Sequence, residues 1–339
     1  MQLEIAQSTP TAASIARLVE LHYAFGHVVA SEFLRRSFNQ VYRLDFADGR
    51  RTIARLCADR PRGAPNLAFE AEALAHWSGA GCAVARCLPT AQGDVAISVP
   101  LPEGARALAL FEYVEGEATS DKTPDIQAFA RGLAGLHAAG HGYRGVASAY
   151  TLDCDYLLLR PLQGLLRAST MTAELGRQFE ELGARLHQRI LALGPLGRVL
   201  CHGDAHGSNN FVLPADPTGQ IVDQQRTAVF FDFDEAGPGY LAYELAVYPW
   251  SLFPRTPDGV PSAKVLAQWQ QFIRAYCAAR PMAEVDLAAI APFMAVRQFW
   301  LLGEYAGRVP VWGSQAIPTD YLRRQVEMLR RWETLELPH

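Results

Sequence analysis

The chain is poor in lysine: of its 31 basic residues only Lys122 and Lys264 are lysines, and the rest are arginines. Its net charge is −4 at pH 7, so no excess of positive charge indicates a nucleic acid or a membrane as a partner. The six cysteines form no Cys-x-x-Cys pair, which argues against a disulfide scaffold or a cysteine metal site. We therefore expect reduced thiols, as in a cytoplasmic protein.

Long apolar runs are also lacking. The best candidate, residues 288–302, is broken by a proline and two polar residues, which argues against a membrane span. The first residues lack the basic start and apolar core of a signal peptide. With 50% apolar and 19% charged residues, the composition is typical of a soluble enzyme.

The pattern of elements changes near residue 114. Before it we expect a short helix (15–23), strands and one longer helix (67–78), and after it mostly helices with a small strand pair. The expected strands are at 38–46, 51–57, 83–85, 94–99, 108–113, 212–213 and 228–233. We predict an α+β protein with a small antiparallel N-lobe, residues 1–114, and a mainly helical C-lobe, residues 115–339.

The most informative stretch is 202–209, His-Gly-Asp-Ala-His-Gly-Ser-Asn, which directly follows an apolar run. It places Asp204 five residues before Asn209, and Asp232 follows downstream in Phe-Phe-Asp-Phe-Asp. Protein kinases use this Asp-to-Asn spacing in their catalytic loop and a later Asp for metal. The spacing predicts Asp204 as the base that orients an acceptor hydroxyl, and Asn209 and Asp232 as Mg²⁺ ligands. A turn capped by Asp and Asn side chains is the structural alternative.

Two carboxylates stand at the end of the expected strand 228–233. If that strand persists, Asp232 and Asp234 point to the same face, and Asp234 becomes a further metal ligand, directly or through water. The alternative is that both carboxylates cap the following Gly-Pro-Gly turn.

Two histidines flank the predicted base. We expect His202 and His206 to hold the loop in shape. With Asp204 they also match part of a zinc site, but no further ligand motif accompanies them.

These motifs, together with Leu-Ala-Gly-Leu-His at 133–137, make the chain resemble the aminoglycoside phosphotransferase/choline kinase family over about residues 20–310. Within it the chain looks most like the branch of type II homoserine kinases and bacterial stress-response Ser/Thr kinases. The resemblance implies a bilobal protein-kinase-like fold with ATP and Mg²⁺ as cofactors. It also implies transfer of the γ-phosphate to an alcohol, mostly on a small molecule such as an amino alcohol or a homoserine-like amino acid.

The N-lobe departs from the kinase pattern. Kinases place a strand lysine between the ATP phosphates and a helix glutamate, and the matching position here is Arg55. Arginine can bind phosphate through two N–H groups, although an ordinary strand arginine that faces solvent is the alternative. Helix geometry selects Glu70 as its partner, because Glu70 shares the apolar face of helix 67–78 and Glu72 does not.

The phosphate-covering loop, Ser-Phe-Asn-Gln-Val-Tyr at 37–42, contains no glycine. Ser37 and Asn39 are its candidate nucleotide contacts, and a plain hairpin is the alternative. At the lobe boundary, we expect the backbone around Glu112 and Val114 to pair with the adenine edge.

Other functions stay open. A haloacid-dehalogenase phosphatase would use Asp232 and Asp234, but it needs them early in an alternating β/α pattern. A nucleotide-binding pseudokinase is compatible with Arg55 and the glycine-free loop, and a stress-response Ser/Thr protein kinase with the family resemblance. For an amino-alcohol acceptor, Glu235 and Glu244 are the candidate acids near the catalytic loop.

Overall fold

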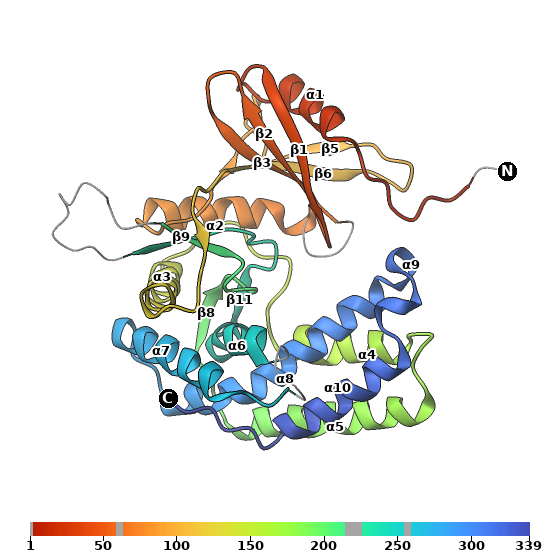
Figure 1. The fold of residues 1–339 in the computed structure, drawn as a ribbon, viewed down its shortest axis with the longest axis vertical. Coiled ribbons are helices and arrows are strands. Elements are labelled where there is room, and N and C mark those ends of the chain that lie inside the picture. Colours follow the sequence, from red (N-terminus) through yellow and green to blue (C-terminus); the bar gives the residue numbers. More distant parts are fainter. Residues whose placement is uncertain (1–2, 59–63, 214–225, 254–258) are drawn as a thin grey trace. The chain divides into compact units, whose positions relative to one another are not determined.

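The computed structural model describes residues 3–58, 64–213, 226–253 and 259–339, which form two compact units (Figure 1). The first unit comprises Met1–Gly116, Gly142–Ala149 and Val229–Glu235. The second comprises Glu117–His141, Tyr150–Ala228 and Ala236–His339. This division differs from a single cut after residue 114, because two later segments belong with the first unit.

The first unit is built on an antiparallel sheet with the order β1-β2-β3-β6-β4, and β5 also pairs with β6. Its strands are β1 (Val28–Arg36), β2 (Gln40–Phe46), β3 (Arg51–Leu56), β4 (Cys87–Leu88), β5 (Ile97–Val99) and β6 (Arg106–Glu112). Helix α1 (Ala12–His22) packs on one face of this sheet (Figure 1). The side chains between α1 and the sheet form a hydrophobic core. Strand β2 contributes to it with alternate residues, because every second residue from Gln40 to Phe46 is buried.

Strand β1 is absent from our sequence prediction. Eight of its nine residues are at least partly exposed, so it lacks the alternation of apolar and polar side chains that marks a half-buried strand. It forms an edge of the sheet, where pairing with β2 rather than burial defines it. The expected strand at 83–85 is also wrong in extent, since only Val84 forms an isolated bridge there.

Helix α2 (Leu67–Gly79) belongs to the first unit and buries the face that carries Glu70 and Trp77. The ring of Trp77 lies 5.0 Å from that of Phe233, which anchors the segment Val229–Glu235. The same segment is held by backbone hydrogen bonds between Phe230 and residues 83 and 85. Packing of an aromatic pair therefore fixes the residues beside Asp232.

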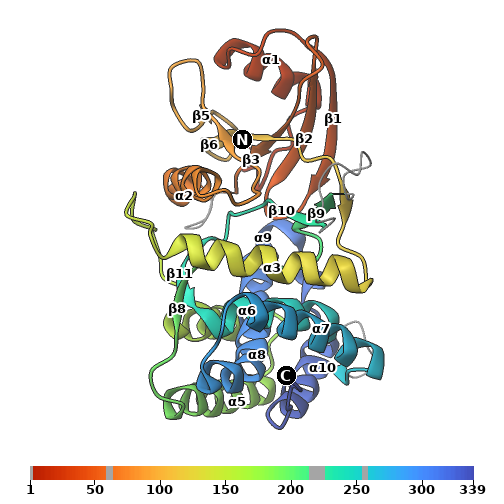
Figure 2. The same ribbon diagram turned by 90° about the vertical axis from the view of Figure 1, so that its left-hand side faces the viewer.

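The second unit is mainly helical. Its helices are α3 (Thr123–Gly140), α4 (Arg160–Leu166), α5 (Ala173–Ala192), α6 (Leu241–Leu252), α7 (Ala263–Ala279), α8 (Glu284–Gly307), α9 (Val309–Trp312) and α10 (Thr319–Trp332). Helix α8 packs against α4, α5 and α6, and α3 lies beside α7 (Figure 2). Helix α8 is long and apolar enough to cross a membrane. However, 78% of its most apolar 18-residue stretch is buried inside the protein, as in the core helix of a folded domain.

Short strands frame the predicted catalytic loop. Strand β8 (Arg198–Cys201) pairs with β11 (Gly237–Tyr240), and β9 (Asn210–Leu213) pairs with β7 (Glu117–Ala118) in a sheet that β10 (Thr227–Phe230) completes. Residues 202–209 connect β8 to β9. The predicted α+β class is confirmed, with an antiparallel sheet in the first unit and mostly helices in the second.

Candidate active site

The loop 202–209 is shaped by a glycine and a buried glutamate of the second unit. Gly203 has φ +85°, a backbone conformation that other residues rarely adopt. Glu244 of α6 is fully buried, and its carboxylate accepts hydrogen bonds from the backbone N–H groups of His202 (3.0 Å) and Gly203 (2.9 Å). Glu244 therefore fixes the backbone of the loop directly before Asp204.

Three side chains orient the carboxylate of Asp204. Arg297 of α8 donates from Nη2 to Oδ1 at 2.5 Å, and Asn209 donates from Nδ2 to Oδ2 at 3.1 Å. The Nε2 atom of His206 lies 3.5 Å from Oδ2. The side chain of Asp204 remains 21% exposed, so a small molecule can reach it.

These neighbours keep Asp204 ionised. Burial alone raises the pKa of a carboxyl group, but the positive charge of Arg297, with smaller contributions from His206 and His202, more than offsets it. The pKa of Asp204 therefore lies well below its ordinary value. Such a carboxylate is a good acceptor for a hydroxyl hydrogen bond and a weak base.

Arg297 is itself buried and held on several sides. Its Nη1 atom donates to the hydroxyl of Tyr243 at 3.0 Å, and its guanidinium carbon lies 3.9 Å from the ring centroid of Trp300 and 4.7 Å from that of Trp250. Burial lowers the pKa of an arginine, yet the charge of Asp204 raises that of Arg297 above its usual value. A permanently charged, well-packed arginine thus fixes the position of Asp204.

The two histidines lie in the loop as expected. His202 is buried, and its Nδ1 atom accepts a hydrogen bond from the backbone N–H of Asp204 at 3.3 Å. The Nδ1 atom of His206 accepts from Ser208 at 3.1 Å. In the described part of the chain no three His, Cys, Asp or Glu side chains form a group able to hold a metal, so the zinc alternative gains no support.

In the first unit, Arg55 of β3 and Glu70 of α2 form a buried ion pair. The Nη1 atom of Arg55 donates to Glu70 Oε1 at 2.9 Å, and Nη2 donates to Oε2. Glu72 instead accepts from the backbone N–H of Val146. Burial lowers the pKa of Arg55, but Glu70 raises it well above the usual value, so the guanidinium stays charged. The structure therefore places the pair where the sequence predicts it, and its role toward a nucleotide stays a prediction.

Asp232 lies next to this pair. Its Oδ1 atom is 3.7 Å from Arg55 Nη1, and its Oδ2 atom accepts from Arg35 Nη2 at 2.8 Å. Strand β10 ends at Phe230, and Asp232 has φ +65°, so the expectation that Asp232 and Asp234 share one face of a continuing strand is wrong. A non-glycine residue in this conformation costs free energy, and such residues cluster at functional sites.

Asp234 is buried and accepts a hydrogen bond from Asn39 Nδ2 at 2.7 Å. The Oδ1 atom of Asn39 accepts from the backbone N–H of Ala58 at 2.9 Å. The Asn39 side chain is thus engaged at both ends and links β2, the chain after β3 and Asp234. This arrangement suits a structural role for Asn39 better than a direct contact to phosphate.

The remaining predicted nucleotide contacts lie at the ends of strands. Ser37 is exposed in the turn between β1 and β2, where its backbone N–H donates to the Asn39 carbonyl. The carboxylate of Glu112 is paired with Arg86, so only its backbone remains a candidate for adenine. Val114 is half-buried just after β6.

The donor set fits Mg²⁺. Carboxylate and amide oxygens are the ligands that this ion prefers, and Asp232 and Asn209 are residues of these two types. That they bind the same ion stays a prediction. The nitrogen of Asn209 donates to Asp204, which leaves its oxygen as the atom able to bind a cation. Two arginines converge on Asp232, which shows that this carboxylate stabilises positive charge.

Sequence reasoning missed three residues of these sites. Arg297 is one of the two polar residues that interrupt the apolar run 288–302, and from the sequence we gave it no role in the site, although a charge in the middle of a buried helix is itself a signal of function. Glu244 was taken as an acceptor-binding acid, but it is fully buried and holds the loop. Arg35 carried no signal, because the strand that contains it was not predicted.

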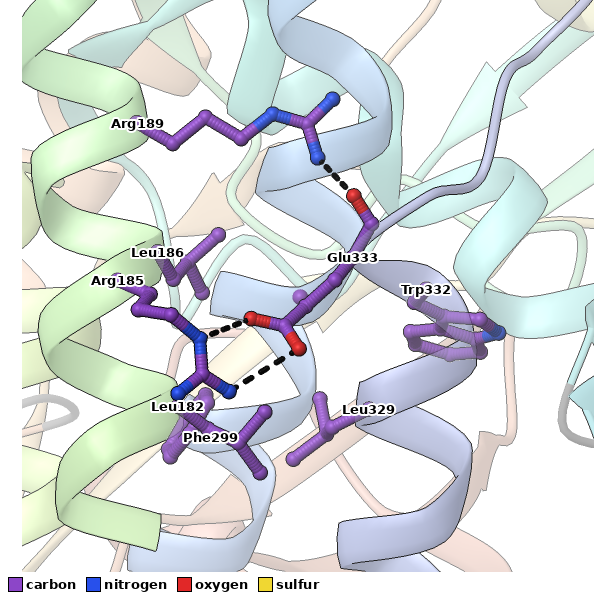
Figure 3. Close-up of a pocket in the computed structure, with 9 residues that line it drawn as sticks. Leu182, Arg185, Leu186, Arg189, Phe299, Leu329, Trp332 and Glu333 are labelled. Atoms are coloured by element: carbon purple, nitrogen blue, oxygen red, sulfur yellow. Dashed lines mark hydrogen bonds and ion pairs between the residues drawn. The ribbon is translucent and has the colours of Figure 1, made fainter. Parts of the chain in front are cut away.

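A cavity in the second unit does not belong to the catalytic loop. Its lining comes from α5, α8 and the end of α10, and the ion pair of Arg185 with Glu333 spans it (Figure 3). Phe299 contributes to the lining, two residues after Arg297 on α8. Residues two apart on a helix point to nearly opposite sides, so this cavity and Asp204 lie on different faces of α8.

Comparison with known proteins places the chain among phosphotransferases. The family model described as "Phosphotransferase enzyme family" matches residues 31–285. An uncharacterized protein of Deinococcus radiodurans is 33% identical over 305 residues, which are 90% of this chain and 85% of that protein.

Solved structures show the same fold. A microcompartment-associated aminopropanol kinase has a TM-score of 0.77 at 20% identity, covering 96% of this chain and all of that one. Amicoumacin kinase hAmiN, in a complex with AMP-PNP, Ca²⁺ and Ami, has a TM-score of 0.72 at 17% identity, covering 93% of this chain and 92% of that one. The branch within the family stays a prediction.

Proposed function

Because the chain belongs to the phosphotransferase enzyme family, we propose that it is an ATP- and Mg²⁺-dependent kinase that phosphorylates a hydroxyl group of a small molecule. The observation that carries this proposal is the buried Arg55–Glu70 pair, which reaches Asp232 at 3.7 Å. An arginine held between two carboxylates, one of them strained into a left-handed conformation, is the arrangement expected of a site for nucleotide and metal.

The residues of the chain would act mainly by positioning. Arg55, fixed by Glu70, would bind the nucleotide phosphates through its N–H groups. Asp232 and Asn209 would hold Mg²⁺, and Asp234 would stabilise the site through Asn39 or the hydration shell of the ion. When bound, Mg²⁺ neutralises charge on the phosphates.

Asp204 would act on the acceptor. Its carboxylate accepts a hydrogen bond from the acceptor hydroxyl, which aligns the oxygen for attack, and takes the proton late in the transfer. The lowered pKa of Asp204 suits this order of events, because a loose phosphoryl-transfer transition state needs orientation more than a strong base.

We further propose an amino alcohol as the acceptor. The similarity to the aminopropanol kinase, which extends over nearly the whole chain, supports this class. Glu304 is a candidate for the contact to the ammonium group, because it follows Arg297 by seven residues on the same face of α8 and acts electrostatically on it.

The test is a phosphotransfer assay with Mg²⁺-ATP and a panel of aminopropanol, ethanolamine, choline, homoserine, an aminoglycoside and a generic protein. We expect one of the small alcohols to be phosphorylated, and Asp204→Asn to lower kcat by about 100- to 10,000-fold, the usual contribution of a positioned acid or base. Consumption of ATP at equal rates by the wild type and Asp204→Asn would refute the proposal.

Other outcomes would identify the alternatives. Phosphorylation of the protein alone would indicate a Ser/Thr protein kinase. Nucleotide binding without transfer to any acceptor would indicate a pseudokinase. A phosphate trapped on Asp232 would indicate a phosphatase of the aspartyl-phosphate type.

A further inference from the structure

Strand β1 changes its register with β2 just before Arg35. Phe33 lies opposite Tyr42, and regular antiparallel pairing would then place Arg35 opposite Gln40. Instead Arg35 lies opposite Val41, and the irregularity falls at the residue between Phe33 and Arg35. A bulge of one residue turns the following side chains to the other face of the sheet.

The bulge brings Arg35 to the face of the sheet that carries Arg55. Val41 pairs with Arg35 on one side and with Arg55 on the other, so the three residues form one row across the sheet. Cross-strand neighbours share a face. Arg36, the next residue, lies opposite Gln40 and donates to the side chain of Gln7. Two adjacent arginines therefore point to opposite faces.

Each carboxylate oxygen of Asp232 meets one of the two arginines. Oδ1 lies 3.7 Å from Arg55 and Oδ2 lies 2.8 Å from Arg35. The Arg55 side chain is 4% exposed and fixed by Glu70, whereas the Arg35 side chain is 51% exposed and can move. A half-exposed ion pair contributes little free energy, so Arg35 can release Asp232 at low cost.

We propose that Arg35 is a phosphate-binding residue of the nucleotide site and that it competes with the divalent cation for Asp232. A guanidinium and a metal ion at Oδ2 repel each other, because both are positively charged. When a cation takes this oxygen, the released guanidinium stands beside Arg55, on the face where nucleotide phosphates are expected. There it supplies charged N–H donors to phosphate beside a loop, residues 37–42, that contains no glycine to let its backbone approach the phosphates closely.

This inference rests on the proposed function, and it predicts effects of opposite sign on two ligands. Removal of Arg35 takes a competitor away from Asp232, so Mn²⁺ alone should bind more tightly, by about 2- to 5-fold for a pair this exposed. The same change removes a charged donor to phosphate, so Mg²⁺-ATP and Mg²⁺-ADP should bind about 10-fold more weakly. Adenosine should bind equally well, because it has no phosphate.

The experiment compares wild type, Arg35→Gln, Arg35→Lys and Arg36→Gln on the full chain. Calorimetry measures Mg²⁺-ATP, Mg²⁺-ADP and adenosine, and the paramagnetic signal of free Mn²⁺ measures binding of the metal alone. We expect the tighter Mn²⁺ and weaker nucleotide binding in Arg35→Gln, partial recovery of nucleotide binding in Arg35→Lys, and wild-type values in Arg36→Gln. Arg36→Gln is the matched control, since it removes the same charge one residue away on the other face.

The inference is overturned if Arg35→Gln binds Mg²⁺-ATP as tightly as the wild type, or if Arg36→Gln loses as much affinity, which would indicate a general effect of charge. It is also overturned if Arg35→Gln weakens Mn²⁺ binding, because the arginine would then support the metal site. Absence of nucleotide binding in the wild type would instead refute the proposed function. A melting temperature close to that of the wild type verifies that Arg35→Gln is folded.

Discussion

Replacement of Arg297 tests whether the orientation of Asp204 limits the reaction. The guanidinium donates to Asp204 and to Tyr243, and it is 3% exposed. Removing one partner of a fully buried ion pair costs about 3–5 kcal/mol. Because 21% of the Asp204 side chain is exposed, water can replace part of the interaction, and we expect about 2 kcal/mol in Arg297→Met.

The loss should appear in kcat. A carboxylate that is free to turn misplaces the acceptor oxygen, and a displacement of about 1 Å costs roughly 100-fold in rate. Arg297→Lys should lose only about 10-fold, because its ammonium keeps the charge but cannot reach both Asp204 and Tyr243. The KM for ATP should stay within about 3-fold, since Arg297 and the Arg55–Glu70 pair belong to different units.

The assay is steady-state ADP release, coupled to NADH oxidation, with the acceptor varied at saturating Mg²⁺-ATP. Arg185→Met is the control, because Arg185 is an exposed arginine of the second unit whose carboxylate partner is Glu333. A kcat in Arg297→Met equal to or above that of the wild type would refute the reasoning. It would show that the basicity of Asp204, which the substitution increases, matters more than its orientation.

Three further predictions concern the supports of the two sites. Glu244→Gln should lower the melting temperature, because the two backbone N–H groups donate to different oxygens of Glu244 and the amide nitrogen that replaces one of them cannot accept. Since the pKa of Glu244 is lowered in the folded state, the stability it adds is present above about pH 4.3 and is lost as the pH falls below that. Thermal melts from pH 7 to pH 3 should therefore show a smaller loss of stability in acid for the variant. Glu304→Gln should raise the KM for an amino alcohol about 10-fold and leave that for the matching diol unchanged, which steady-state kinetics would show; equal changes for both would exclude the ammonium contact. Arg55→Lys should weaken Mg²⁺-ATP binding about 10-fold in calorimetry, because one ammonium cannot replace the two hydrogen bonds to Glu70, and unchanged binding would remove Arg55 from the nucleotide site.

What the sequence predicted well depends on neighbours along the chain. Asp204 and Asn209 are five residues apart in one loop, so a spacing motif was enough to join them. Glu70 was chosen over Glu72 because helix periodicity alone decides which of them faces the sheet. In both cases the geometry is local, and local geometry can be read from a single chain.

What the sequence did not predict depends on distant partners. Arg297 reaches Asp204 across 93 residues, and Arg35 reaches Asp232 across 197. No periodicity encodes such pairs. The bulge in β1 cannot be read either, because almost all of that strand is exposed and so carries no pattern of burial. The left-handed backbone of Asp232 is likewise imposed by tertiary packing and overrides the strand pattern before it.

The scarcity of lysine acquires a physical meaning in these sites. A lysine offers one compact charge, whereas the guanidinium of arginine can bind two groups at once. Arg55 uses this to hold Glu70 with two nitrogens while one of them stays near Asp232, and Arg297 uses it to hold Asp204 and a tyrosine hydroxyl. Each carboxylate expected to act in phosphoryl transfer is thereby tied to a second group of its own unit. Because the fold itself then sets the orientation of these carboxylates, an arginine at the position of the kinase lysine does not by itself argue for an inactive enzyme.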